Sequence, residues 1–328
     1  NQLPIKPDVI ELIDKMSEEQ QIAYWENVNV WILPKEKEFA QYCLIKLLQA
    51  NRPYSVMKQL CFDDFGNSEI ILEALHQGLL YYPNSENNGI CLNSISSYEL
   101  EELFEKLYND KNVDPLQVSR LEFAYVQKFD LDFEPKCLIE NLLSDPSLFL
   151  EIISCFYKND DHSDEVLQKV GKSVLTNTFE VLRRIKQLPG QQGNEINKEN
   201  FDNWITEVRK LAKERKYEKA CDMEIGKILS YSPIDEDGVW PHKYVREFFE
   251  LNSSEILENN FRIGLFNQRG VHAVTGGDEE EKIAKKYYDY AEKLRISYPR
   301  TSYILKTIGD SFKSESQCER ARELKGYY

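Results

Sequence analysis

The stretch EFAQYCLIKLL, residues 38–48, decides the fold class of this chain. Its apolar side chains recur every three or four residues, which places them along one face of an α-helix. They are Phe39, Ala40, Cys43, Leu44, Leu47 and Leu48. A half-buried strand would alternate apolar and polar residues, and sustained alternation is nearly absent from the sequence. The stretch therefore predicts a helix with one buried face.

The same spacing continues along most of the chain. It recurs at Ile70, Ala74, Leu75 and Leu79; Leu100, Leu103, Phe104 and Leu107; Val170, Val174, Leu182 and Ile185; Phe201, Trp204, Ile205, Val208 and Leu211; Ile283, Ala284, Tyr287, Tyr288 and Ala291; and Ile304, Leu305, Ile308 and Phe312. Breaks are expected at 83–89, 158–164, 189–197, 232–240 and 267–277. Amphipathic helices without a sheet must pack on one another, and no fixed repeat is found. The prediction is an all-α fold, an irregular α-solenoid or array of stacked helical hairpins.

Helix start signals agree with this reading. Capping-box patterns begin at Ser17, Ser96 and Asn252, and a proline at the expected first helical position occurs at Pro146, Pro241 and Pro299. A capping side chain accepts from a backbone amide that the helix itself leaves unbonded, and proline lacks the N–H that would be left over there.

The negative charge of the chain is concentrated in its first half. The formal net charge is −15, of which residues 1–160 carry −14. We therefore expect an acidic helical array over 1–160 and a second helical subdomain over 161–328 that continues the array. The acidic half is a poor partner for duplex DNA or an anionic membrane, because phosphate contacts need cations.

Composition restricts the setting and the chemistry. The seven cysteines are scattered without a C-x-x-C pair, which indicates buried reduced thiols in a cytoplasmic protein rather than disulfides or zinc. No apolar run approaches the roughly 18 residues of a membrane span, so a soluble protein is expected. The sequence begins at Asn1 without an initiator Met and without a secretory segment, so we expect it to be a piece of a longer polypeptide.

The loop before the acidic segment DEEE raises the question of phosphate binding. A glycine pair, Gly276 and Gly277, precedes the helix expected from Asp278, and a helix N-terminus can bind anions. The first turn, 278–281, is however four carboxylates, which would repel phosphate, and the P-loop Lys and Ser/Thr are missing. A glycine-permitted turn with an acid-capped helix is the preferred interpretation.

Two loops hold candidate ligand or partner contacts. Arg269 and His272 lie in one, and Asp237 and Trp240 in the other. An enzyme site is one alternative, and it requires these four side chains to converge on one pocket. The structural alternative is a tight turn at Asp237-Gly238 with Trp240 anchoring the next helix. A calcium-binding loop starting at 235 is disfavoured because it would lack its last acidic ligand.

Two further segments are partner candidates. The stretch VRKLAKERKYEK, 208–219, could track nucleic-acid phosphates, or it could be a solvated helix face. Its candidate cations are Arg209, Lys210, Lys213, Arg215 and Lys216. Aromatic residues gather at 24–33 and 287–294, where core packing is the simpler account, and Tyr290 is expected to lie off the buried stripe.

Several motifs together resemble a family. They are RLEFAYVQKFDL, LLSDPSLFLEIISCFYK, LPGQQGNEINKENFDNWITEVRKLA, DGVWPHKYVREFFE, NFRIGLFNQRGVHAVTGGDEEEKIAKKYYDYAEKL and YPRTSYILKTIGDSF. These resemble the uncharacterised helical C-terminal regions of large multidomain bacterial proteins, some of which carry N-terminal NTPase or nuclease-like modules in anti-phage systems. The resemblance implies a sensing, scaffolding or assembly array, and it supplies no catalytic residue to transfer.

The expected function is accordingly a non-catalytic α-helical scaffold or sensing module that acts through protein contacts in the bacterial cytoplasm. No catalytic residue, cofactor or metal is predicted. An enzyme built around the loops 232–240 and 267–277, and a nucleic-acid-binding helical domain, are the alternatives.

Overall fold

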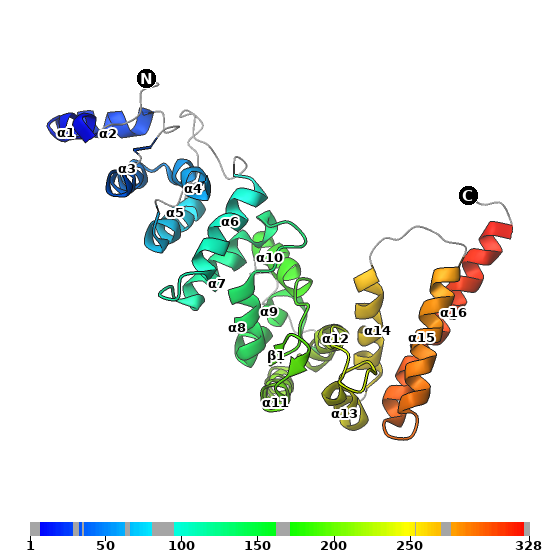
Figure 1. Cartoon of the computed structure of the whole chain (residues 1–328). Coiled ribbons are helices and arrows are strands. Elements are labelled where there is room, and N and C mark those ends of the chain that lie inside the picture. The colour runs from blue at the N-terminus through cyan, green and yellow to red at the C-terminus, as the bar shows by residue number, and fades with distance from the viewer. Residues whose placement is uncertain are drawn as a thin grey trace. The chain divides into compact units, whose positions relative to one another are not determined.

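The chain is all-α, as the sequence predicts. The computed structural model describes residues 7–28, 33–34, 36–62, 66–80, 95–161, 171–252, 254–269 and 277–324. Within these ranges the chain forms sixteen α-helices, one 3₁₀ helix and one short two-stranded hairpin (Figure 1). The helices divide between two compact units, residues 1–139 and 140–328.

The first unit is built from seven α-helices and the 3₁₀ helix within the described residues. They are α1 (Pro7–Asp14), α2 (Glu18–Asn27), α3 (Lys37–Gln49), α4 (Pro53–Phe62), α5 (Ser68–Leu80), α6 (Ser97–Tyr108), α7 (Pro115–Tyr125) and η2 (Val126–Lys128). The helix α8 (Lys136–Ser144) crosses the division. In α3 the buried side chains are Ala40, Cys43, Leu44, Leu47 and Leu48, the stripe that the opening stretch predicts. Helices α4, α5 and α6 pack against one another over this core.

A buried carboxylate ties the end of the first unit together. Glu122 of α7 is fully buried and accepts the hydroxyl of Tyr108. It also accepts the backbone N–H of Leu138, at 2.6 Å, in the first turn of α8. A carboxylate at a helix N-terminus satisfies amides that the helix leaves unbonded. One side chain thus joins α6, α7 and α8.

The second unit holds the remaining helices and the hairpin. They are α9 (Pro146–Phe156), α10 (Lys172–Leu182), β1 (Gln191–Gln192), β2 (Glu195–Ile196), α11 (Lys198–Arg215), α12 (Glu218–Leu229), α13 (Lys243–Asn252), α14 (Glu255–Arg269), α15 (Asp278–Leu294) and α16 (Pro299–Leu324). α11 packs on α9, where the Phe149 and Trp204 rings are 4.8 Å apart between centroids. α12 packs closely on α14, and α15 lies beside α16 as a hairpin with a short turn (Figure 1).

Four of the six predicted helix starts are confirmed. Ser17 and Ser96 form complete capping boxes, while Pro146 and Pro299 begin their helices. The other two predictions are wrong. Asn252 is the last residue of α13, and the Ser254 hydroxyl instead accepts the N–H of Leu257 in the first turn of α14. Pro241 precedes α13 by two residues. His242 lies between them and caps the helix, because its Nδ1 accepts the N–H of Tyr244 and its carbonyl accepts the N–H of Val245.

The division between the units falls earlier than the change in charge. The sequence places it near residue 160, where the acidic half ends, whereas the compact units meet after Ile139. The reason is packing, since α9 contacts α10, α11 and α12 and therefore belongs with the second unit. The stacking of all helices into a solenoid stays a prediction.

Candidate functional site

The predicted stripe that begins at Phe201 positions the candidate site. Helix α11 starts at the N-cap Asn197, whose side chain accepts the N–H of Asn200 at 3.0 Å, and ends at Lys216 in the left-handed conformation with φ 63°. Its buried face contains Phe201, Trp204, Ile205, Val208 and Ala212, all of which except Ala212 the periodicity names. The residues beside that face line a groove shared with α12 and α13.

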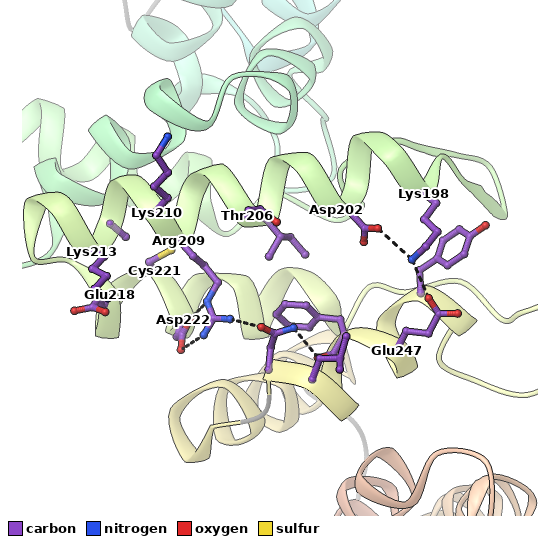
Figure 2. A pocket seen from close by; sticks show the side chains of 16 residues that line it. Lys198, Asp202, Thr206, Arg209, Lys210, Lys213, Glu218, Cys221, Asp222 and Glu247 are labelled. Atoms are coloured by element: carbon purple, nitrogen blue, oxygen red, sulfur yellow. Dashed lines mark hydrogen bonds and ion pairs between the residues drawn. The ribbon is translucent and has the colours of Figure 1, made fainter.

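Ion pairs mark both ends of this α11–α13 groove, which has a volume of about 640 Å³. At one end, the Lys198 ammonium lies 2.8 Å from a carboxylate oxygen of Glu247 and 3.1 Å from one of Asp202. At the other end, the Arg209 guanidinium lies 3.1 Å from Asp222 (Figure 2). The hydrogen bond from Lys198 to Glu247 is the main reason that the Lys198 pKa is raised above its ordinary value.

Arg209 is oriented from three sides. Besides its bond to Asp222, it donates to the side-chain oxygen of Asn252 at 3.0 Å and lies 5.9 Å from the Phe248 ring centroid. The Ser254 hydroxyl in turn donates to Asp222 at 3.3 Å. A guanidinium with this many partners is held in one orientation, which makes the end of the groove rigid.

Between the ion pairs the groove has a mixed lining. Ile205, Phe248 and Leu251 contribute apolar side chains, and Leu251 of α13 has 83 % of its surface exposed, while Thr206 and Tyr244 contribute hydroxyl groups. The Cys221 thiol also lines it, but burial raises its pKa and keeps it protonated. No histidine is among the described residues that line the groove.

The basic segment 208–219 is largely neutralised within the described chain. Arg209 bonds Asp222, Lys210 lies 2.9 Å from Glu207, and Lys216 pairs with Asp161. Lys213, Arg215 and Lys219 are exposed and make no ion pair among the described residues. A phosphate backbone would meet three unpaired cations rather than the six in the segment, which weakens the electrostatic basis for nucleic-acid binding.

The loop 232–240 forms a buried arginine cluster. Asp237 accepts two hydrogen bonds from the Arg246 guanidinium, at 2.7 and 2.9 Å, and these bonds hold the Asp237 pKa below its ordinary value. The Trp240 indole donates to the carbonyl of Ser232 at 2.7 Å and stacks on Phe261. Both residues therefore act in a tight turn, with Gly238 at φ 72°, and the Asp237 carboxylate is already occupied by Arg246.

Arg269 belongs to a second cluster. It ion-pairs with Glu280 of α15, a buried side chain, and lies 5.7 Å from the Phe312 ring centroid. The rings of Phe312 and Tyr287 stack between it and Trp240, with centroid separations of 5.9 Å and then 5.7 Å. The structure thus links Arg269 to Trp240 through two aromatic rings.

The other predicted residues have varied outcomes. His272 lies outside the described residues, so its convergence with Arg269 stays a prediction. Tyr290 is half-buried, with the Lys286 ammonium 5.8 Å from its ring centroid. Gly277 has φ 85° and precedes the four carboxylates of α15, which confirms the glycine-permitted turn and the acidic first turn.

The described ranges contain neither a candidate metal site nor a candidate membrane span. No three His, Cys, Asp or Glu side chains there are placed to hold a metal ion. Nor does any helix in the same ranges combine the length and apolar character needed to cross a membrane.

Sequence reasoning missed the groove itself. Lys198 begins α11, whereas Glu247 and Leu251 lie four residues apart on α13, and nothing in the sequence indicates that the two helices meet there. One signal was readable, since Leu251 lies off the face of α13 that buries Val245, Phe248 and Phe249. A single exposed apolar residue is common on protein surfaces, so this signal becomes specific only once the groove is known.

A comparison of the chain with protein-family models, with curated proteins and with solved structures finds no match.

Proposed function

We propose that this chain is a non-catalytic α-helical module that binds another protein through the α11–α13 groove. The observation that carries the proposal is the exposed Leu251 beside Phe248, set between two ion-paired ends. Protein interfaces commonly combine an apolar centre with a polar rim, and few residues at the centre supply most of the binding energy.

The charges of the groove favour a protein over a polyanion. Lys198, Arg209 and Lys210 each have a carboxylate partner, so the groove offers balanced charge rather than a positive track. A partner with an aliphatic side chain for the centre and side chains of both signs for the ends would match it. Following the sequence resemblance, we place this module in the bacterial cytoplasm as a scaffolding or sensing part of a larger protein.

The test compares two substitutions that each replace an exposed aliphatic side chain with Glu. Leu251→Glu puts a charge in the groove, whereas Ile296→Glu puts one at an equally exposed site, 87 % exposed, in the turn before α16. Partners are captured from source cells on the wild-type chain, identified by mass spectrometry and purified. Their dissociation constants are then measured by calorimetry for all three chains.

We expect Leu251→Glu to weaken the partner by about thirtyfold or more, the range of a hot-spot residue, and Ile296→Glu to leave it unchanged. Equal affinities of the two variants for every captured protein would rule out the groove as the docking surface. A chain that captures no protein would contradict the proposed function altogether.

A further inference from the structure

A second pocket lies on the opposite flank of α11. It is bounded by the N-terminal half of that helix, the β1–β2 hairpin and the segment 140–146, and it has a volume of about 900 Å³. Asn200, Asn203 and Glu207 recur at helical spacing on this flank, whereas Lys198, Asp202 and Arg209 recur on the flank of the α11–α13 groove. The two sites therefore use different faces of one helix.

Side-chain amides dominate this pocket, which we call the amide pocket. It is lined by Gln187, Gln191, Gln192, Asn197, Asn200 and Asn203. Two of these side chains form hydrogen bonds within the protein. The Gln191 amide accepts from the N–H of Leu188 and donates to the carbonyl of Gly193, both at 2.9 Å. The Asn197 side chain caps α11. In the part of the chain that the structure describes, the side chains of the other four make no hydrogen bond within the protein.

Those four amides are well matched to a peptide main chain. Each amide side chain offers one acceptor oxygen and two N–H donors, the same groups that an extended peptide presents along its backbone. Gly190 allows their close assembly, because it has φ 70° and a Cβ there would lie 2.8 Å from the Cβ of Asn200. The backbone beneath the pocket is thus fixed before any ligand arrives.

The charge of the amide pocket selects against anions. Glu140, Glu195 and Glu207 line it, and no Lys, Arg or His does. Lys210 neutralises Glu207 from outside the pocket, at 2.9 Å, which leaves two exposed carboxylates facing a ligand. A phosphate or carboxylate would be repelled, whereas an ammonium or guanidinium group would gain an ion pair.

The aromatic content argues against sugars and nucleobases. Trp204 is the one aromatic residue lining the pocket, and it is only 3 % exposed. Its indole N–H is already donated to the carbonyl of Leu142 at 2.9 Å. A sugar or base would therefore find no open ring to stack on, and stacking is a main source of affinity for both.

We infer that the amide pocket binds an extended peptide segment that carries a Lys or Arg side chain. The four unbonded amides pair with the main chain of the segment, and Glu140 and Glu195 receive its cation. This mode adds main-chain hydrogen bonds to one charged anchor. The inference does not depend on the α11–α13 groove, which takes its ligand on the other flank.

The test uses the whole chain labelled with ¹⁵N. Two pools of acetylated, amidated pentapeptides are titrated, one with Lys fixed at the centre and one with Glu, the other four positions being mixed. The side-chain NH₂ signals of Gln187, Gln192, Asn200 and Asn203 report binding, and each is assigned by its loss in the corresponding Ala variant. Maltopentaose is titrated in parallel as the sugar probe.

We expect the Lys pool to shift these four signals and the Glu pool to bind at least about fivefold more weakly. Asn200→Ala and Asn203→Ala should each weaken the Lys pool by about five- to tenfold, as the loss of a hydrogen-bonding partner implies. Neither change touches the cap of α11, because that bond uses the backbone N–H of Asn200. Glu195→Gln should reduce the preference for the Lys pool.

Gln317→Ala, which removes an exposed amide of α16 outside the pocket, is the matched control and should change nothing. The inference fails if neither pool moves the four signals, if the Glu pool moves them as strongly as the Lys pool, or if maltopentaose alone moves them. Leu251→Glu should leave the Lys pool unaffected, so failure of the groove and failure of the amide pocket are distinguishable.

Discussion

Arg246 shows how one side chain can fix a loop and a helix together. It is 1 % exposed, and it donates to the carbonyls of Pro241, at 2.5 Å, and Val239 as well as to Asp237. Its guanidinium also lies 3.7 Å from Asp235, which is buried. A buried charge is tolerated only when its donors are satisfied, and these partners satisfy them.

Arg246→Leu should lower the free energy of unfolding by about 3–5 kcal/mol, because it leaves the Asp235 carboxylate buried beside fewer donors. Urea denaturation followed by circular dichroism measures this. Arg183→Leu is the control, since Arg183, the residue after α10, makes a partly exposed pair with Glu180 at the end of that helix, and it should cost under about 1 kcal/mol. Arg246→Lys keeps the charge but loses the fork and should fall between the two. Equal losses for the Leu variants would contradict the account.

His242 makes stability depend on pH. Burial is the main cause that lowers its pKa, against the opposing attraction of Asp235, whose carboxylate lies 3.4 Å from Nε2. Lys243 and Arg246 lower it further, while Glu236 raises it. Since the folded pKa is below the unfolded value of about 6.5, the unfolded state binds more protons between the two values. Stability is therefore complete above about pH 6.5 and is lost as the pH falls toward the folded pKa.

We expect the free energy of unfolding of the wild type to decrease between about pH 7 and about pH 5.5, the range set by histidine titration. His242→Gln should flatten this decrease, whereas His76→Gln, at an exposed position of α5, should not. Urea midpoints measured across this range provide the comparison. Parallel pH profiles for the wild type and His242→Gln would show that the buried imidazole is not responsible.

At the scale of the helices, close packing depends on a few small residues. A Cβ on Gly226 of α12 would lie 2.5 Å from the carbonyl oxygen of Leu257 in α14 and 3.0 Å from Asn260. A Cβ on Gly264 of α14 would likewise clash with Ser230, in the loop after α12. These two glycines let the helix backbones approach, and backbone atoms cannot give way as a flexible side chain does.

The sign of the change in the free energy of unfolding of Gly226→Ala tests this contact. Alanine in an open helix position would stabilise by about 1 kcal/mol, because it loses less backbone entropy than glycine. Here the clash should reverse the sign and destabilise by about 1–3 kcal/mol, the usual cost of overpacking. Lys219→Ala on the exposed side of α12 should stay within about 0.5 kcal/mol. A stabilised Gly226→Ala variant would show that α12 and α14 are less tightly packed.

At the scale of the whole molecule, charge separates the two parts of the chain. The first unit, residues 1–139, holds 12 basic and 23 acidic side chains, a charge of −11 out of the total −15, so self-repulsion is concentrated there. The second unit instead pairs many of its charges, as at Lys198, Arg209 and Arg269. Salt screens both repulsion and attraction between exposed charges.

Raising the ionic strength from about 0.01 M to about 0.15 M should therefore stabilise the first unit and leave the second unchanged or slightly less stable. Hydrogen exchange with mass spectrometry can follow both in one sample, since slower exchange in α3–α7 marks the first effect. Peptides from α11–α14 serve as the internal control. The same change in both sets would mean that the charge asymmetry does not govern stability.

The sequence by itself determined the all-α class, four helix starts and many of the buried faces. Periodicity and capping act within a few residues along the chain, so Leu44, Ser96 and Gly277 could each be interpreted from their neighbours. It also indicated that Asp237 and Trp240 form a turn, although it did not indicate that Arg246 would hold that turn.

Only the tertiary structure decided where side chains from different helices meet. The groove joins residues of α11, α12 and α13, and the amide pocket joins α11 with the hairpin and α8. A stripe of apolar residues specifies that a face is buried, but the crossing of two helices depends on how their surfaces interlock. The pairing of Arg209 with Asp222, and thus the charge left for a partner, follows from that packing.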